Sequence, residues 1–187
     1  MKLIGLSGTN GSGKDTIGQL LDSRHNFLFV SMTDMLREEA MNRKLGTSRE
    51  VLRTISAEWR RELGLGVLVD KAVEHYHQQG GDDRYVGLVI ASLRNPGEND
   101  RVHELGGEVV WIDANPRARY DRLKARMRAD DPQSFEEFLA HEQAEMDHSG
   151  DEATLSMRAV KEKSDRVFQN EYPDLDTVDQ AVTDTLL

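Results

Sequence analysis

The chain has 187 residues, with 24 lysines and arginines against 34 aspartates and glutamates, so its net charge is -10. This length predicts one domain, and so acidic a surface argues against a nucleic-acid backbone or an anionic membrane as the main partner. The chain has no cysteine, which excludes disulfide bridges and thiolate zinc sites, and the apolar start at residues 3–6 is too short for a signal peptide. We therefore expect a soluble, cytoplasmic protein that binds neither membranes nor nucleic acid.

The first half of the chain begins with two strands and continues as helices. Residues 3–7 are an apolar run that ends in glycines, typical of a buried strand, and residues 16–21 continue as a helix. A second strand is expected at residues 27–30. The helices expected after it are at residues 34–44, from a capping box of Thr47 and Glu50 to about residue 59, and at 67–78. Because residues 34–80 contain no predicted strand, we interpret them as a helical insertion.

The second half returns to alternating strands and helices. Pro116 supports the start of one helix, since proline is favoured in the first turn. Strands that alternate with helices indicate a parallel sheet covered by helices on both faces. The strands are predicted at residues 85–90, 108–112 and 166–169, and the helices at 116–127, 134–146 and 176–187.

Residues 8–16, Gly-Thr-Asn-Gly-Ser-Gly-Lys-Asp-Thr, lie between the first strand and its helix. This context makes a G-x-x-x-x-G-K motif credible as a phosphate-binding loop. The glycines allow consecutive backbone N–H groups to turn toward a phosphate, the helix start adds its positive dipole end, and Lys14 supplies a mobile charge. The alternative is a glycine-rich turn with a chance lysine. Asp15 stands where the motif usually has serine or threonine, with Thr16 next.

On these residues the chain resembles the nucleoside monophosphate kinases, adenylate kinase among them, and the related dephospho-coenzyme A kinases. Adenylate kinases carry G-x-x-G-x-G-K-G-T, which residues 8–16 match with Asp15 in place of one glycine. The overall pattern is most similar to an uncharacterised group of adenylate-kinase-related proteins found in archaea. The likeness extends over most of the chain, although only the phosphate loop is specific by itself. It implies a three-layer α/β P-loop kinase core over residues 1–187, with a five-stranded parallel sheet, an acceptor-binding helical insertion at 34–80 and a short lid at 115–135.

Residues 30–37, Val-Ser-Met-Thr-Asp-Met-Leu-Arg, look like the S-T-G-D-M-L-R segment that opens the acceptor-binding helices of adenylate kinases. The resemblance implies that Arg37 holds the acceptor phosphate and that Asp34 lies near the metal and its waters. Independently, an arginine one turn into a helix that leaves a strand points toward the edge of the sheet where α/β proteins bind ligands. The alternative is a solvated Arg37 that pairs with Glu38 or another neighbour.

The third predicted strand leads into residues 91–94, Ala-Ser-Leu-Arg. In the family this strand ends in an aspartate that helps to organise Mg²⁺, followed by a glycine and then by an arginine that clamps the transferring phosphates. Arg94 matches that arginine, whereas Ala91 replaces the aspartate. We hypothesise that Asp15 and Asp34 supply the missing carboxylate function, because Mg²⁺ needs only one or two carboxylates beside phosphate oxygens. The alternative is a site that has lost catalysis and only binds nucleotide.

Arg119, Arg122 and Arg126 fall on one face of a single predicted helix. A solvated face of salt bridges is the common explanation of such a stripe. However, residues 121–126 look like the D-R-x-x-x-R with which these kinases enter their lid, which implies that Arg122 packs near adenine and that Arg126 reaches the phosphates. Residues 128–131, Arg-Ala-Asp-Asp, resemble the R-x-D-D that leaves the lid, so the lid is expected to be very short.

Less specific matches complete this interpretation. Asn170 follows the last predicted strand, in the region that borders adenine, and His141 stands where related sequences have a further arginine. The one Glu-x-x-His pair in the chain is not enough for a di-metal bundle, which needs two. The residues interpreted as surface or packing residues rather than metal ligands are His75, His77, Glu145 and His148.

We therefore expect the chain, as a monomer or homodimer, to transfer the γ-phosphoryl group of Mg-ATP to a small nucleotide, first of all a (deoxy)nucleoside monophosphate. The alternative acceptor is dephospho-coenzyme A, whose hydroxyl would need a base, and Asp34 is the only well-placed candidate. The alternative from another class is an ATP-binding switch module without catalysis, which three arginines converging from separate elements disfavour. The expected catalytic residues are Lys14, Asp34, Arg94 and Arg126; the ATP-binding residues are Gly8, Asn10, Gly11, Ser12, Gly13, Lys14, Asp15, Thr16, Arg122 and Asn170; Arg37 and Arg94 bind the acceptor, and Asp15, Thr16 and Asp34 surround Mg²⁺.

Overall fold

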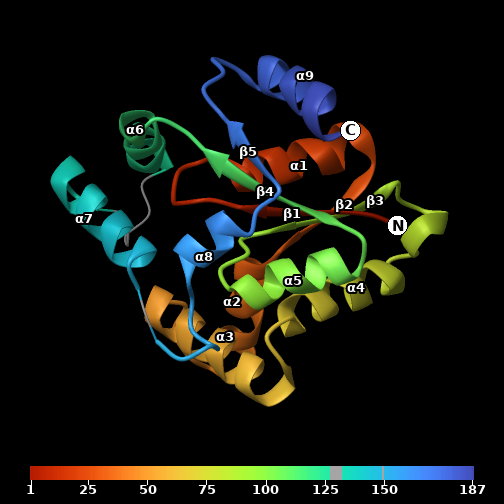
Figure 1. Cartoon of the computed structure of the whole chain (residues 1–187), viewed down its shortest axis with the longest axis horizontal. Coiled ribbons are helices and arrows are strands. Elements are labelled where there is room, and N and C mark those ends of the chain that lie inside the picture. The colour runs from red at the N-terminus through yellow and green to blue at the C-terminus, as the bar shows by residue number, and fades with distance from the viewer. Residues whose placement is uncertain (127–131, 149) are drawn as a thin grey trace.

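The protein is built on a central parallel sheet, which a computed structural model describes over residues 1–126, 132–148 and 150–187 (Figure 1). Its five strands follow the order β2-β3-β1-β4-β5, and every neighbouring pair is parallel. The predicted fold class is confirmed. Because β1 is the central strand, the loop that follows it lies between the ends of β3 and β4, where open α/β sheets bind ligands. The strands are β1 (Lys2–Ser7), β2 (Phe27–Ser31), β3 (Gly87–Ala91), β4 (Glu108–Asp113) and β5 (Arg166–Gln169).

Helices cover both faces of the sheet, so the fold has three layers (Figure 1). One face is covered by α1 (Lys14–His25) and α9 (Leu175–Leu186), and the other by α4 (Val67–Gln78), α5 (Pro96–Glu104) and α8 (Met157–Glu162). No helix in the described part of the chain is both long enough and apolar enough to cross a bilayer. The elements toward the carboxyl ends of the strands are α2 (Met32–Asn42), α3 (Arg49–Leu63), α6 (Pro116–Arg126) and α7 (Phe135–Met146), and a short 3-10 turn (Gly81–Asp83) precedes β3.

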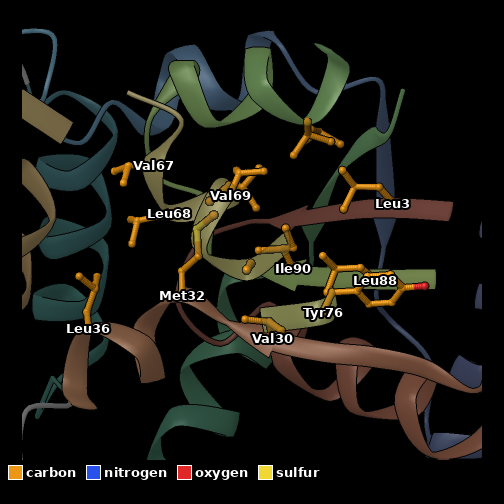
Figure 2. Packing of buried hydrophobic residues seen from close by; sticks show 14 of the residues in the cluster. Leu3, Val30, Met32, Leu36, Val67, Leu68, Val69, Tyr76, Leu88 and Ile90 are labelled. Carbon is orange, nitrogen blue, oxygen red and sulfur yellow. The ribbon is translucent and has the colours of Figure 1, made fainter. Parts of the chain in front are cut away.

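Alternate residues of each strand pack into different layers, as expected for strands that are buried on both faces. In β3, Leu88 and Ile90 join the cluster beneath α4 and α5, whereas Val89 and Ala91 join the cluster beneath α1 and α9. The packing places α4 in the layered core, although it lies within the region predicted as an insertion. Figure 2 shows part of the first cluster, where the strand residues Leu3, Val30, Leu88 and Ile90 meet Met32 and Leu36 of α2 and Val67, Leu68, Val69 and Tyr76 of α4.

The start of α3 differs from the sequence prediction. The helix begins at Arg49, and its N-cap is Ser48, whose Oγ accepts a hydrogen bond from the Val51 N–H at 3.4 Å. The predicted capping box of Thr47 and Glu50 was therefore wrong by one residue. Both positions carry a hydroxyl, and the sequence pattern alone does not distinguish between them.

Two helices escaped prediction because they carry little apolar periodicity. α5 begins with Pro96 and has a capping box between Asn95 and Glu98, but Val102 is its only buried apolar residue. α8 has six residues, which is too short for a periodic pattern. Both helices lie on the sheet face opposite α1, and the chain that leads into α5 carries Arg94.

Candidate active site

Three glycines with a left-handed backbone shape the loop between β1 and α1. Their φ angles are 141° at Gly8, 78° at Gly11 and 93° at Gly13. A Cβ atom at Gly8 would lie 2.2 Å from the Ile112 carbonyl oxygen, at Gly11 2.5 Å from the Arg119 carbonyl oxygen, and at Gly13 2.3 Å from a side-chain nitrogen of the segment after β5. At Gly8 and Gly11 the obstructing atoms belong to the backbone, so no side chain fits there, and at Gly13 the left-handed φ itself favours glycine. The loop can therefore press against β4 and α6 because these positions are glycine.

Arg122 and Asn170 hold the outer side of this loop. The Arg122 guanidinium donates to the carbonyl oxygens of Gly11 (3.3 Å), Ser12 (3.4 Å) and Asn170 (2.8 Å), and the Asn170 side chain donates to the same Ser12 oxygen at 2.8 Å. By contrast, the N–H groups of Gly11 and Lys14 donate to no other described residue, and the buried Ser12 Oγ has no partner there either. The loop thus offers unpaired groups at the positive end of α1, which suits a phosphate. The role of Arg122 and Asn170 toward adenine stays a prediction.

A cavity of about 480 Å³ opens beside the loop. Although the chain as a whole is acidic, the wall of this cavity is rich in positive charge, which favours a small polyanionic ligand. The wall includes the predicted residues Asn10, Lys14, Asp15, Asp34, Arg37, Arg94 and Arg126, which come from separate parts of the chain. Among the described side chains of the wall, the cationic ones are Lys14, Arg37, Arg49, Arg53, Arg60, Arg61, Arg94 and Arg126, and the carboxylates are Asp15, Asp34 and Glu145.

Lys14 begins α1, and its side chain is buried. Burial lowers the pKa of its ammonium group; the charges of Asp15 and Glu145 oppose this shift, and those of Arg94 and Arg126 add to it. Lys14 forms neither a hydrogen bond nor an ion pair with another residue of the described ranges. A buried cation without a direct partner is costly, and an anionic ligand would remove that cost.

Asp34 and Arg37 stand together at the start of α2. The Ser31 hydroxyl caps this helix by accepting a hydrogen bond from the Asp34 N–H at 3.2 Å. Arg37 Nη1 lies 2.6 Å from Asp34 Oδ1, so Arg37 does pair with a neighbour, as the alternative held, and that neighbour is Asp34 and not Glu38. Both side chains face the cavity, where an acceptor would meet a cation and a carboxylate side by side.

Arg94 is positioned by the backbone that follows β3. Ala91 is fully buried, and Ser92 takes a left-handed φ of 76°, which is unusual for a residue with a side chain. Glu98 Oε2 then accepts hydrogen bonds from the N–H groups of Arg94 at 2.7 Å and Asn95 at 3.1 Å. This turn delivers the Arg94 side chain to the cavity wall beside Lys14.

Helix α3 contributes arginines to the cavity that sequence reasoning missed. Arg49 and Arg53 lie one helical turn apart, and Arg60 and Arg61 follow on the same helix. The i, i+4 spacing of Arg49 and Arg53 indicates that the two share one face of the helix, but such a pair is ordinary on a solvated helix. Glu145 was also misread: it is a buried part of the cavity wall and not simply a packing residue.

The three arginines of α6 diverge to different partners. Arg119 is only 3% exposed; its two terminal nitrogens lie 2.7 and 2.9 Å from the Glu142 carboxylate, and it donates to Thr9 Oγ1 at 2.7 Å. Arg122 reaches the loop carbonyls, and Arg126 lines the cavity. A solvated face is thus the wrong explanation for Arg119, which supports the phosphate loop through its hydrogen bond to Thr9.

The remaining predicted features are placed less decisively. His141 is exposed, lies 3.8 Å from Glu137 and is not among the described residues of the main cavity wall. His75 and His77 are exposed, as expected for surface residues. Residues 128–131, which resemble the exit of a lid, lie outside the described residues.

The carboxylates suited to Mg²⁺ are Asp15 and Asp34, which line the cavity, whereas Thr16 is exposed and outside the described wall. Within residues 1–126, 132–148 and 150–187, no three histidine, aspartate or glutamate side chains are close enough to hold a metal ion. Two carboxylates nevertheless fit Mg²⁺, because this ion keeps several waters and takes other ligands from substrate phosphates. The assignment of all three residues to Mg²⁺ stays a prediction.

This chain is similar to known proteins in sequence and in fold. A family model described as an AAA domain matches residues 4–145. The UPF0200 protein of Pyrococcus abyssi is 31% identical over 151 residues, covering 77% of this chain and 78% of that protein. The UPF0200 protein of Methanococcus vannielii is 30% identical over 174 residues, covering 91% and 92%. The shikimate kinase of Bacteroides thetaiotaomicron superposes with a TM-score of 0.59 at 15% identity, covering 98% of this chain and 95% of that one, which is a likeness of fold alone.

Proposed function

Because this chain belongs to the AAA-domain family and to the UPF0200 proteins, and has the fold of P-loop kinases, we propose that it transfers the γ-phosphoryl group of ATP to a small anionic acceptor. One observation carries the proposal: a single cavity joins the P-loop Lys14 to arginines of α2, of α3 and of the turn after β3. A protein that only binds nucleotide needs the phosphate loop but not a second set of arginines. The set is what a second, anionic substrate requires.

The donor and the transfer would be served by separate groups. Lys14 and the N–H groups of the loop hold the donor phosphates, while Arg94 and Arg126 neutralise the charge that spreads over the transferring oxygens. A nucleophilic oxygen of the acceptor bonds to the γ-phosphorus as the bond from that phosphorus to the bridging oxygen breaks, and ADP leaves. Mg²⁺, when bound beside Asp15 and Asp34, would supply further positive charge for the phosphate oxygens.

The acceptor we favour is a (deoxy)nucleoside monophosphate. Its phosphate oxygen is already a nucleophile and needs no base, and Arg37, aided by Arg49 and Arg53, would hold the phosphate. A hydroxyl acceptor such as dephospho-coenzyme A is the second candidate. Asp34 supports this candidate, because its carboxylate lies on the cavity wall, 2.6 Å from Arg37, and would take the proton of the hydroxyl group.

A coupled ADP-release assay with Mg-ATP tests the proposal. The acceptor panel contains nucleoside monophosphates, deoxynucleoside monophosphates, dephospho-coenzyme A and shikimate, the last because a shikimate kinase shares the fold. We expect at least one class of acceptor to stimulate ADP release well above the rate with ATP alone, since water should be a poor acceptor in a closed site. Tight ATP binding with no stimulation by any member would instead favour the nucleotide-binding switch.

The metal assignment predicts that Asp15→Ala will raise the Mg²⁺ concentration for half-maximal turnover by about tenfold, because one of two carboxylates near the phosphates is lost. The measurement is a Mg²⁺ titration at saturating ATP and acceptor. Asp184→Ala, which removes an exposed carboxylate from α9, is the control and should leave the titration unchanged. Identical Mg²⁺ dependence in Asp15→Ala and the parent protein would show that Asp15 does not serve the metal.

A further inference from the structure

Glu145 of α7 is a buried carboxylate in a cavity that otherwise suits anions. Its side chain is 8% exposed, and its Oε1 lies 2.8 Å from Arg53 Nη2 and 3.4 Å from Arg94 Nη1. Burial raises the pKa of Glu145, but the charges of Arg94, Arg53 and Arg49 outweigh burial and hold it below its usual value. Glu145 is therefore an ionised carboxylate at neutral pH, and it bridges one arginine of α3 to the arginine that follows β3.

The position of Glu145 on its helix links the cavity to the rest of the site. One turn earlier on α7, Glu142 pairs with Arg119, which also donates to Thr9 in the phosphate loop. The residue after Glu145 is Met146, which packs against the cluster of the buried Trp111. A movement of α7 that accompanies a shift of the Glu145 carboxylate would thus change the contact of Arg119 with the phosphate loop and the packing around Trp111.

Substrate phosphates would compete with this carboxylate. Arg94 is close enough to Lys14 for its charge to lower the pKa of the Lys14 ammonium, so a phosphate held by Lys14 would lie near Arg94. Arginine binds phosphate through two parallel hydrogen bonds. Glu145 already occupies one of these donors. Leaving a carboxylate beside phosphate groups in one cavity would also place like charges at short range, which is unfavourable.

We propose that Glu145 is an internal anion, which occupies Arg53 and Arg94 while the site lacks substrate and is displaced from them when phosphate groups bind. Through this exchange α7 responds to occupancy of the cavity. The identity of the natural ligand rests on the proposed function, but the exchange of one anion for another requires no turnover. The inference can therefore be tested by binding alone.

The first test measures binding of inorganic pyrophosphate by isothermal titration calorimetry. Glu145→Gln keeps the shape and a hydrogen-bonding oxygen but removes the charge, so it should bind pyrophosphate about tenfold more tightly than the parent protein. Glu136→Gln, at an exposed position of the same helix, is the matched control and should bind as the parent does. Equal or weaker binding by Glu145→Gln would overturn the proposal, because a residue that merely positions the arginines would weaken binding when changed.

The second test follows Trp111 fluorescence in a Trp59→Phe background, since the chain has only two tryptophans. Pyrophosphate should change the emission of Trp111 when Glu145 is present, because Glu145 is displaced and Met146 moves with it. Adding Glu145→Gln should abolish most of this change, since the glutamine side chain makes no ion pair that pyrophosphate must break. Equal changes in both backgrounds, or failure of all variants to bind pyrophosphate, would contradict the internal-anion role.

The two proposals fail in different ways. If no acceptor stimulates ADP release but Glu145→Gln binds pyrophosphate more tightly, the internal anion stands and the phosphotransferase proposal fails. If an acceptor is found but Glu145→Gln binds pyrophosphate no better than the parent, the phosphotransferase stands and the internal anion is rejected. Glu145→Asp, which withdraws the charge by one methylene, should give intermediate binding and guards against a folding defect of the glutamine variant.

Discussion

Replacing Lys14 by alanine should lower kcat/KM for ATP by about 10³-fold, whichever acceptor is used. Lys14 is buried beside the unpaired N–H groups of the phosphate loop, and its ammonium has no direct partner among the described residues. Alanine at this position leaves the start of α1 without a positive charge to meet the donor phosphates. Steady-state kinetics with ATP varied at saturating acceptor measure the effect. Lys124→Ala, which removes an exposed cation from α6, is the control and should be nearly neutral.

Arg37→Ala should give a different pattern. Arg37 faces the cavity from α2 and is proposed to hold the acceptor phosphate. Its loss should therefore raise the acceptor KM by about tenfold and leave the ATP KM nearly unchanged. Comparing the two variants with each substrate in turn tests the division of roles. Equal effects of Lys14→Ala and Arg37→Ala on both substrates would show that donor and acceptor are not held by separate groups.

Loss of the Glu98 charge should destabilise the fold by about 3–5 kcal/mol, because it leaves Arg60 as an uncompensated buried cation. Arg60 is 3% exposed and Glu98 is fully buried; Arg60 Nη2 and Nε lie 2.7 and 3.1 Å from Glu98 Oε1. Urea unfolding of Glu98→Gln should show a lower midpoint at an unchanged slope. The same substitution should reduce turnover, since Glu98 also accepts the hydrogen bond of the Arg94 N–H.

The control for this prediction is Glu104→Gln on the same helix. Glu104 pairs with Arg101 but its side chain is 63% exposed, and an exposed pair of this kind contributes about 1 kcal/mol at most. Arg60→Met combined with Glu98→Gln should recover part of the lost stability, because the double variant leaves no unpaired charge between α3 and α5. A loss in Glu98→Gln no greater than in Glu104→Gln would mean that the buried pair does not hold α3 to α5.

The phosphate loop could be predicted from the sequence because its requirements are local. Left-handed φ angles at Gly8, Gly11 and Gly13 call for glycine, and the lysine must begin the helix that follows. The strands were found for a similar reason, since residues buried on both faces form short apolar runs. By contrast, α5 was missed, because its buried residues include Glu98 and Asn99 and carry no apolar pattern.

The charged side chains of the site could be predicted only in part. Arg94 and Arg37 follow strand ends, so their position in sequence already points toward the ligand edge of the sheet. Arg53 and Glu145 are 92 residues apart, and each has the sequence context of an ordinary surface helix. Arg119 has the same spacing on α6 whether it is solvated or, as in the structure, buried against Glu142.

The sequence by itself determined the five strands and the site of the phosphate loop, because backbone preferences and apolar periodicity act over a few residues. Only the tertiary structure decided which cations of this acidic chain surround the cavity and which carboxylates accompany them. The reason is that α3 packs into the core with α2 and α4 through Leu52 and Ile55, whereas α7 packs against α6 through Phe138. That packing, and not the local sequence, brings Arg53, Arg94 and Glu145 together.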